Sequence, residues 1–73
     1  MAIGKTNVTN TIRALRARHG AMTQQELAER VGVSRQTIVA IEKARYSPTL
    51  ELAFKIAGVF GEPVEGVFRF GGD

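Results

Sequence analysis

A chain of 73 residues has room for one domain, and we expect residues 1–73 to form a single unit without a separate catalytic or sensory domain. Hydrophobic residues make up 44% and charged residues 23% of the chain, which excludes a disordered tail, and the absence of cysteine excludes disulfide bonds and thiolate metal sites. The net charge of +3 is unevenly distributed, because residues 1–45 carry eight Lys or Arg and three acidic residues whereas residues 46–73 carry two and four.

Apolar residues near the N-terminus recur at helical spacing. Val8, Ile12 and Leu15 stand at positions i, i+4 and i+7, which places them on one face of a helix. We therefore predict a first helix over about residues 8–18, with Gly20 as its stop signal.

The second predicted helix begins at a clear N-terminal signal. Thr23 to Glu26 match a capping box, in which the threonine oxygen and the glutamate carboxylate each accept a hydrogen bond from a free backbone N–H. Met22 can pack on Leu27, and the helix has to end at Gly32, because glycine tolerates positive φ at a helix terminus. The residues that this helix is expected to bury are Leu27, Ala28 and Val31.

A third helix, over about residues 34–44, follows after a very short connection. Only Val33 separates Gly32 from Ser34, the next N-cap residue, so the two helices have to cross at a steep angle. Ile38 and Ile41 point the third helix toward the core. The opposite side is available to a partner and carries Arg35, Gln36, Val39, Ala40 and Lys43.

The C-terminal part contains two more predicted helices. Ser47-Pro48 marks a loop, since proline restrains the residue before it. A fourth helix over about residues 49–59 is expected to bury Leu50, Ala53, Ile56, Ala57 and Phe60. A fifth helix runs from Pro63 to about Gly66 with Val64 and Val67 turned inward, and residues 68–70 are compatible with a brief strand. The predicted fold is therefore all-α, a compact domain of five helices with a short terminal strand.

This pattern resembles the helix-turn-helix of the Xre family, which includes phage repressor and Cro proteins. The motif that carries the resemblance runs from Gln24 to Lys43 and lies within a helix-turn-helix at about residues 23–44. The whole stretch that resembles the family extends from about Ile12 to Phe68. The small Ala28 lets the two helices approach each other, and Gly32 makes the turn. The matching residues are Thr23-Gln24, Leu27-Ala28, Gly32-Val33-Ser34, Ile38, Ile41-Glu42 and Ser47-Pro48.

The resemblance implies that the third helix reads base edges in the major groove of double-stranded DNA. Arginine can pair with guanine and glutamine with adenine, each worth about 1–3 kcal/mol of discrimination, while valine and alanine can contact a thymine methyl group. The base-reading residues are then Arg35, Gln36, Val39 and Ala40. The alternative is that Arg35 and Gln36 belong to an ordinary solvated helix face.

Phosphate contacts are expected from the start of the second helix and from the loop after the third helix. The candidate residues are Thr23, Gln24, Lys43, Arg45, Tyr46 and Thr49. For Tyr46, packing over the loop with the hydroxyl in water is an equal alternative. Together these contacts would fix the register of the protein on DNA but not its sequence preference.

Two further features follow from the family resemblance. It implies an ion pair between Arg16 and Glu42, which would stabilise the fold; the alternative is that water solvates both side chains. Many relatives have glycine where this chain has Ala44, so positive φ at this position would strain the backbone unless the third helix extends slightly.

We therefore expect a transcriptional regulator, and specifically a repressor, that binds a roughly palindromic operator as a homodimer. The expected dimer surface is the segment from Val64 to Phe70, with residues 1–3 as strand partners; the alternative is that Phe68 and Phe70 close the core of their own chain. The candidate interface residues are Val64, Val67, Phe68 and Phe70. Two other functions stay open: the antitoxin of a toxin–antitoxin pair, and a protein-interaction module for an acidic partner.

Enzymatic activity, metals and cofactors are not expected. His19 is the single histidine, and no nucleophile, base and orienting group can be assembled around it. The chain has neither an apolar run of membrane-spanning length nor the apolar stretch of a signal peptide, so we expect a cytoplasmic protein.

Overall fold

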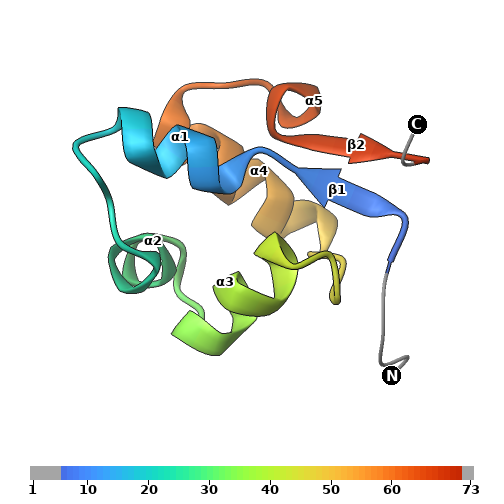
Figure 1. The fold of residues 1–73 in the computed structure, drawn as a ribbon, viewed down its shortest axis with the longest axis horizontal. Coiled ribbons are helices and arrows are strands. Elements are labelled where there is room, and N and C mark those ends of the chain that lie inside the picture. Colours follow the sequence, from blue (N-terminus) through green and yellow to red (C-terminus); the bar gives the residue numbers. More distant parts are fainter. Residues whose placement is uncertain (1–5, 72–73) are drawn as a thin grey trace.

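The computed structural model describes residues 6–71 and places five helices beside a two-stranded sheet (Figure 1). This confirms the predicted five-helix fold. No helix within the described range is long and apolar enough to cross a membrane. In chain order the elements are β1 (Val8–Asn10), α1 (Ile12–Arg18), α2 (Gln24–Val31), α3 (Arg35–Glu42), α4 (Leu50–Phe60), α5 (Val64–Val67) and β2 (Phe68–Phe70).

Residues 8–10 form a strand, so the prediction that the first helix begins at Val8 was wrong. β1 pairs with β2 in antiparallel register, with Val8 opposite Phe70 and Asn10 opposite Phe68. The Asn10 side chain accepts a hydrogen bond from the Ile12 N–H at 3.1 Å, which gives the first turn of α1 an acceptor and starts the helix there. Val8 still packs against the core, but from the strand. The expected strand partners, residues 1–3, lie outside the described residues.

The hydrogen bonds of α2 and α3 confirm the predicted helix starts. The Thr23 Oγ1 accepts from the Glu26 N–H at 3.0 Å, and the Thr23 N–H donates to the Glu26 carboxylate at 2.8 Å. The Ser34 hydroxyl accepts from the Thr37 N–H at 3.2 Å. Gly32 adopts φ 78°, so α2 ends in the left-handed conformation and the chain turns directly into α3.

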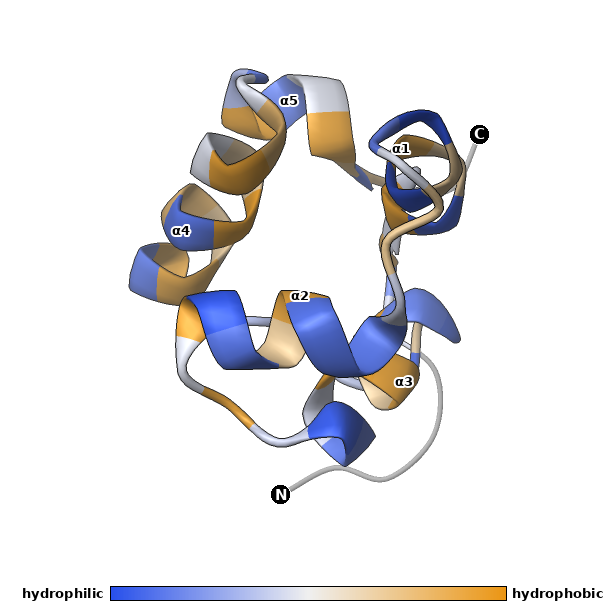
Figure 2. Cartoon of the chain, turned by 90° about the vertical axis from the view of Figure 1, so that its left-hand side faces the viewer, coloured by the Kyte–Doolittle hydropathy of each residue, from blue (hydrophilic) through white to orange (hydrophobic). Residues whose placement is uncertain are grey.

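The core lies between the helices and receives residues from all five of them. α4 turns its hydrophobic side toward the other helices and its hydrophilic residues outward (Figure 2). The buried residues are Ile12, Leu15, Met22, Leu27, Ala28, Val31, Ile38, Ile41, Leu52, Ala53, Ile56, Ala57, Phe60, Val67 and Phe68.

Leu50 was predicted to be buried and is instead 71% exposed. Leu50 is the first residue of α4, and the inward face of this helix runs through Leu52, Ala53 and Ile56. Leu50 lies at the edge of this face, at the end of the helix, on the same side as Phe54, four residues later, which is 60% exposed.

Ala44 adopts φ 57°, so the backbone after the third helix is in the left-handed region. α3 ends at Glu42, and the extension that would relieve Ala44 does not occur. The Ala44 N–H donates to the Ile41 carbonyl at 3.0 Å, and its carbonyl accepts from the Thr6 N–H at 2.8 Å. These two hydrogen bonds hold alanine in a conformation that costs a non-glycine residue about 1–2 kcal/mol.

Candidate nucleic-acid interface

The third helix presents the predicted base-reading residues to solvent. Arg35 and Gln36 occupy its first two positions and are exposed, whereas Val39 and Ala40 are half-buried one turn further along. On the other side of the helix, Ile38 is 0% and Ile41 1% exposed. α3 is therefore anchored by two isoleucines while its N-terminal end projects polar side chains outward.

An open groove of about 920 Å³ lies between α1, the start of α2 and α3. Its cationic side chains include the exposed Arg13, Arg35 and Lys43. The complete lining is Asn10, Thr11, Arg13, Ala14, Arg16, Thr23, Gln24, Gln25, Arg35, Val39, Glu42 and Lys43. This concave surface carries the charge that attracts a polyanion, and it lies beside the outward face of α3.

Arg13 also lines this groove, although it was not predicted as a binding residue. A signal for it existed, because Arg13 stands three residues before Arg16, the predicted partner of Glu42. Residues three apart share one side of a helix. Because the Arg16 side chain reaches α3, Arg13 has to lie on the same side of α1.

The structure confirms the predicted ion pair between Arg16 and Glu42. The Arg16 Nε donates to Glu42 Oε2 at 2.8 Å and its Nη2 to Oε1 at 3.1 Å, with side-chain exposures of 15% and 9%. A further hydrogen bond joins the Arg16 Nη1 to the Met22 carbonyl at 2.8 Å. Because the two charges compensate each other, the groove's positive charge comes from its other cations.

Glu42 also fixes a candidate phosphate-binding side chain. The Gln24 Nε2 donates to Glu42 Oε1 at 3.2 Å, so one network joins α1, α2 and α3. Gln24 keeps a second amide N–H that can donate to a phosphate oxygen. The ion pair therefore positions Gln24 at the start of α2 before any ligand is bound.

Thr23 is already occupied by the cap of α2, where its backbone N–H donates to Glu26 and its hydroxyl accepts from the Glu26 N–H. The hydrogen bond from the Thr23 N–H to the carboxylate lowers the pKa of the Glu26 carboxyl most, followed by the Thr23 side chain, with a smaller contribution from Arg30. A ligand at Thr23 would therefore compete with the Glu26 carboxylate for the hydroxyl proton. The next two N–H groups of the helix have no intrahelical acceptor and point out of its N-terminus.

The loop after α3 places its candidate residues differently from one another. Lys43 and Arg45 are exposed, as phosphate contacts need to be. Tyr46 is half-buried and packs against the core, so the packing alternative holds for its ring. Thr49 caps α4 by accepting from the Leu52 N–H at 3.2 Å, which leaves its hydroxyl proton available.

The four candidate dimer residues do not form one surface. Val67 and Phe68 are 1% and 8% exposed and belong to the core of their own chain, so their inclusion in a dimer surface was wrong. Val64 is half-buried against the same core. Phe70 alone among the four is largely exposed, at 82%.

Known proteins share both the fold and the sequence pattern. A crystal structure of a Bacteroides fragilis protein superposes with a TM-score of 0.73 over 85% of this chain and 98% of that chain, at 24% identity, which shows the fold. An uncharacterized HTH-type transcriptional regulator of Methanocaldococcus jannaschii is 52% identical over 88% of this chain and 96% of its own length.

Two further relatives come from bacteria. The HTH-type transcriptional regulator YgzD of Bacillus subtilis is 51% identical over 81% of this chain and 88% of its own length. The cryptic phage CTXphi transcriptional repressor RstR of Vibrio cholerae is 38% identical over 77% of this chain and 50% of its own length. The helix-turn-helix family model matches residues 12–67, and the chain belongs to this family, in its Xre-like branch.

Proposed function

We propose that this protein is a transcriptional repressor that binds a roughly palindromic DNA operator as a homodimer, with α3 in the major groove. The observation that carries the proposal is the exposure of Arg35 and Gln36 at the N-terminal end of a helix whose opposite side is fully buried. The names of the relatives support the same function, because they are HTH-type transcriptional regulators and one is a phage repressor.

The first turn of α3 supplies the sequence specificity. A major groove admits one helix, and the residues near the N-terminal end of that helix meet the base edges. Arg35 then donates to guanine and Gln36 pairs with adenine, and Val39 and Ala40 contact thymine methyl groups one turn later. The half-burial of Val39 and Ala40 suits this role, because their exposed atoms lie close to the helix surface.

Groups around the groove and the loop hold the phosphate backbone. Lys43 and Arg45 follow α3 directly and are exposed, and Arg13 lies across the groove on α1. Gln24, oriented by Glu42, and the free N–H groups of α2 add uncharged donors. Thr49 and Thr23 can each donate a hydroxyl proton, and the Tyr46 hydroxyl can do so while its ring stays packed.

A second copy of the chain supplies the second half of the operator. One recognition helix reads only a few base pairs, and two half-sites about 34 Å apart place both helices on the same side of the duplex. This arrangement requires a two-fold axis that leaves α3 uncovered in both copies.

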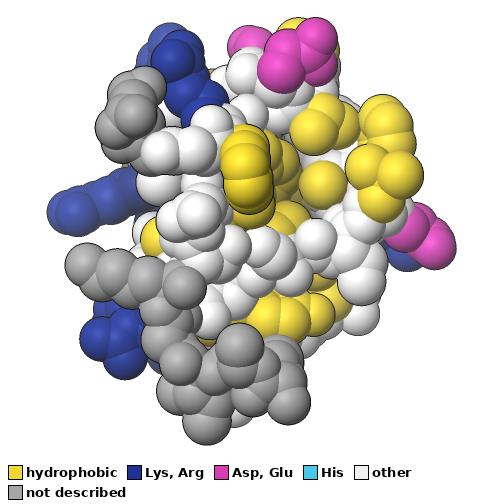
Figure 3. Space-filling view, turned by 90° about the vertical axis from the view of Figure 1, so that its right-hand side faces the viewer, with side chains coloured by type: hydrophobic (Ala, Val, Ile, Leu, Met, Phe, Trp, Pro, Cys, Tyr) yellow, Lys and Arg dark blue, Asp and Glu magenta, His cyan; other side chains and the backbone are white. Residues whose placement is uncertain are grey.

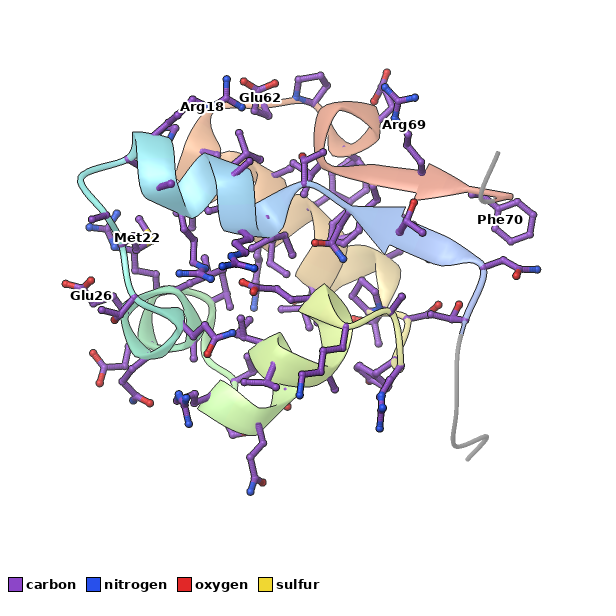
Figure 4. The ribbon with its side chains drawn as sticks, in the orientation of Figure 1. Arg18, Met22, Glu26, Glu62, Arg69 and Phe70 are labelled. Atoms are coloured by element: carbon purple, nitrogen blue, oxygen red, sulfur yellow. The ribbon has the colours of Figure 1, made fainter. Side chains whose placement is uncertain are left out.

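Selection of binding sites from random duplexes tests the proposal with the intact chain and with the variants Arg35→Ala and Gln36→Ala. We expect each variant to lose base preference at one or two positions of each half-site, at a cost of about 1–3 kcal/mol for the preferred base. Arg18→Ala is the matched control, since Arg18 is exposed at the opposite edge of the molecule from α3 and its loss changes the net charge equally (Figure 4).

Two results would refute the base-reading role. The first is a uniform loss of affinity in Arg35→Ala with an unchanged base preference, because that result would show that Arg35 contacts only phosphate. An intact chain that enriches no common sequence, or whose DNA affinity does not fall steeply as salt is raised, would contradict operator binding itself.

A further inference from the structure

Residues 6–10, which include β1, connect the terminal sheet of β1 and β2 to the end of the recognition helix (Figure 1). We call residues 6–10 the strap. The Asn10 side chain has two partners: its oxygen accepts from the Ile12 N–H at 3.1 Å, and its Nδ2 donates to the Ile41 carbonyl at 2.8 Å. Asn10 and Ile41 are 31 positions apart in the chain. Asn10 therefore ties the start of α1 to the last turn of α3.

Thr6, at the other end of the strap, is bonded to the loop that follows α3. Its N–H donates to the Ala44 carbonyl at 2.8 Å, and its hydroxyl shares a hydrogen bond with the Ser47 hydroxyl at 2.8 Å. Arg45 and Tyr46 lie between these two attachment points. The strap therefore holds the loop on both sides of two expected phosphate contacts.

The end of α3 needs support from outside the helix. The Arg45 N–H donates to the Ala40 carbonyl at 2.9 Å and the Ala44 N–H to the Ile41 carbonyl at 3.0 Å, which is the hydrogen-bond pattern of a Schellman motif. Glycine usually occupies the left-handed position of this motif, and here Ala44 holds it at φ 57°. A residue in such a conformation keeps it only when the surrounding structure holds it there.

We propose that Asn10, supported by Thr6, is a positioning residue for DNA binding: it holds the end of α3 so that Lys43 and Arg45 meet phosphate. This inference rests on the proposed function, because Lys43 and Arg45 are its expected phosphate contacts. Both cations are exposed, whereas Asn10 is half-buried and bonded to α3, so its effect on DNA passes through the loop.

The distribution of charge gives the position of this loop its importance. Viewed from the end of the molecule that carries β2, most Lys and Arg side chains gather along the left edge, and acidic side chains lie at the top and on the right (Figure 3). A duplex is attracted to the positive side. A loop whose backbone is already held in place loses less conformational entropy when its side chains bind phosphate.

Binding of the full chain to DNA tests the proposal with the variant Asn10→Ser. Serine can still accept from the N–H two residues later, so α1 keeps its start, but the side chain is too short to reach the Ile41 carbonyl. Asn10→Ser should bind a selected operator and a random duplex about 3–10-fold more weakly, equally for both, because phosphate contacts carry no sequence information. Asn7→Ser is the matched control, since Asn7 is exposed, and should keep the affinity of the intact chain.

Hydrogen exchange separates positioning from a general loss of stability. The Ala44 and Arg45 amides should exchange faster in Asn10→Ser, because their acceptors lie at the end of α3 that has lost a hydrogen bond. Ala17→Gly is the control for stability, since Ala17 is exposed on α1 and does not line the groove. At a temperature where it is fully folded, Ala17→Gly should change neither the DNA affinity nor the exchange of these two amides.

The double variant Asn10→Ser with Arg45→Ala shows whether Asn10 acts through the loop. The combined loss of affinity should be smaller than the sum of the two single losses, because Arg45→Ala has already removed one of the contacts that Asn10 positions. Additive losses, or equal affinities of Asn10→Ser and Asn7→Ser, would overturn the inference and leave operator binding standing. The expected losses on a random duplex, in a chain that enriches no common sequence, would support the inference and contradict the proposed function.

Discussion

Replacement of Ala44 by glycine should stabilise the fold. Ala44 holds φ 57°, which costs a residue with a side chain about 1–2 kcal/mol. Glycine removes this cost but loses about 0.5–1 kcal/mol more than alanine in chain entropy on folding. Both hydrogen bonds of Ala44, to Ile41 and from Thr6, use backbone atoms and are kept. The net expectation is a gain of about 0.5–1 kcal/mol in the free energy of unfolding.

For a chain of this length that gain corresponds to a rise of roughly 2–8 °C in Tm, measured by thermal unfolding at one fixed protein concentration. Ala21, with φ 55°, should respond to glycine in the same direction. Ala17→Gly is the matched control, because Ala17 is exposed within α1 and the same substitution there should cost about 1 kcal/mol. If Ala44→Gly lowers Tm as Ala17→Gly does, the left-handed conformation at position 44 does not significantly reduce the free energy of unfolding.

Three other perturbations give distinct results. Glu42→Ala should lower the free energy of unfolding by about 1–3 kcal/mol, because it leaves the nearly buried Arg16 guanidinium without its carboxylate. An unchanged midpoint in chemical denaturation would contradict a structural role for the ion pair. Thr23→Ala should cost about 1 kcal/mol through loss of the N-cap. The pKa of Glu26 in the folded chain lies below the ordinary value of 4.5, so the unfolded chain binds more protons at this carboxylate. The contribution of the carboxylate to stability is therefore present above pH 4.5 and is lost as the pH falls through the folded pKa. Because Thr23→Ala keeps the backbone N–H that contributes most to the lowered pKa, this variant should retain most of the acid dependence of stability; complete loss of that dependence would refute the leading role of the backbone hydrogen bond. Lys43→Ala should lower DNA affinity equally for all sequences and reduce the slope of log K against log salt by about one; a change in base preference would instead place Lys43 against a base.

The features that the sequence predicted correctly depend on neighbours along the chain. The capping box at Thr23, the N-cap at Ser34 and the turn at Gly32 each involve residues within four positions of one another. The inward direction of Ile38 and Ile41 follows from the helical period alone. Such local signals predict the start of the recognition helix and its outward face without knowledge of the rest of the fold.

The features that the sequence did not predict depend on distant partners. Val8 has helical spacing to Ile12, but its strand conformation follows from pairing with Phe70, at the far end of the chain. Leu50 is hydrophobic and was expected inside, whereas it is the first residue of α4 and lies at the end of the helix, where no other element of residues 6–71 covers it. The Arg16–Glu42 pair was reached only through family resemblance, because no local rule relates two residues on helices separated by α2.

A direct structural link joins the terminal sheet to the recognition helix. Asn10 lies in β1 opposite Phe68 of β2, and its side-chain Nδ2 donates to the Ile41 carbonyl near the end of α3 at 2.8 Å. Thr6, ahead of the same strand, donates its N–H to Ala44 just beyond that helix. Because β2 is bonded to β1 and β1 to the end of α3, the terminal sheet and the recognition helix form one hydrogen-bonded unit. The proposed palindromic operator, with half-sites about 34 Å apart, requires a fixed distance between two recognition helices, and a rigid connection of this helix to the rest of its own copy favours one spacing over many.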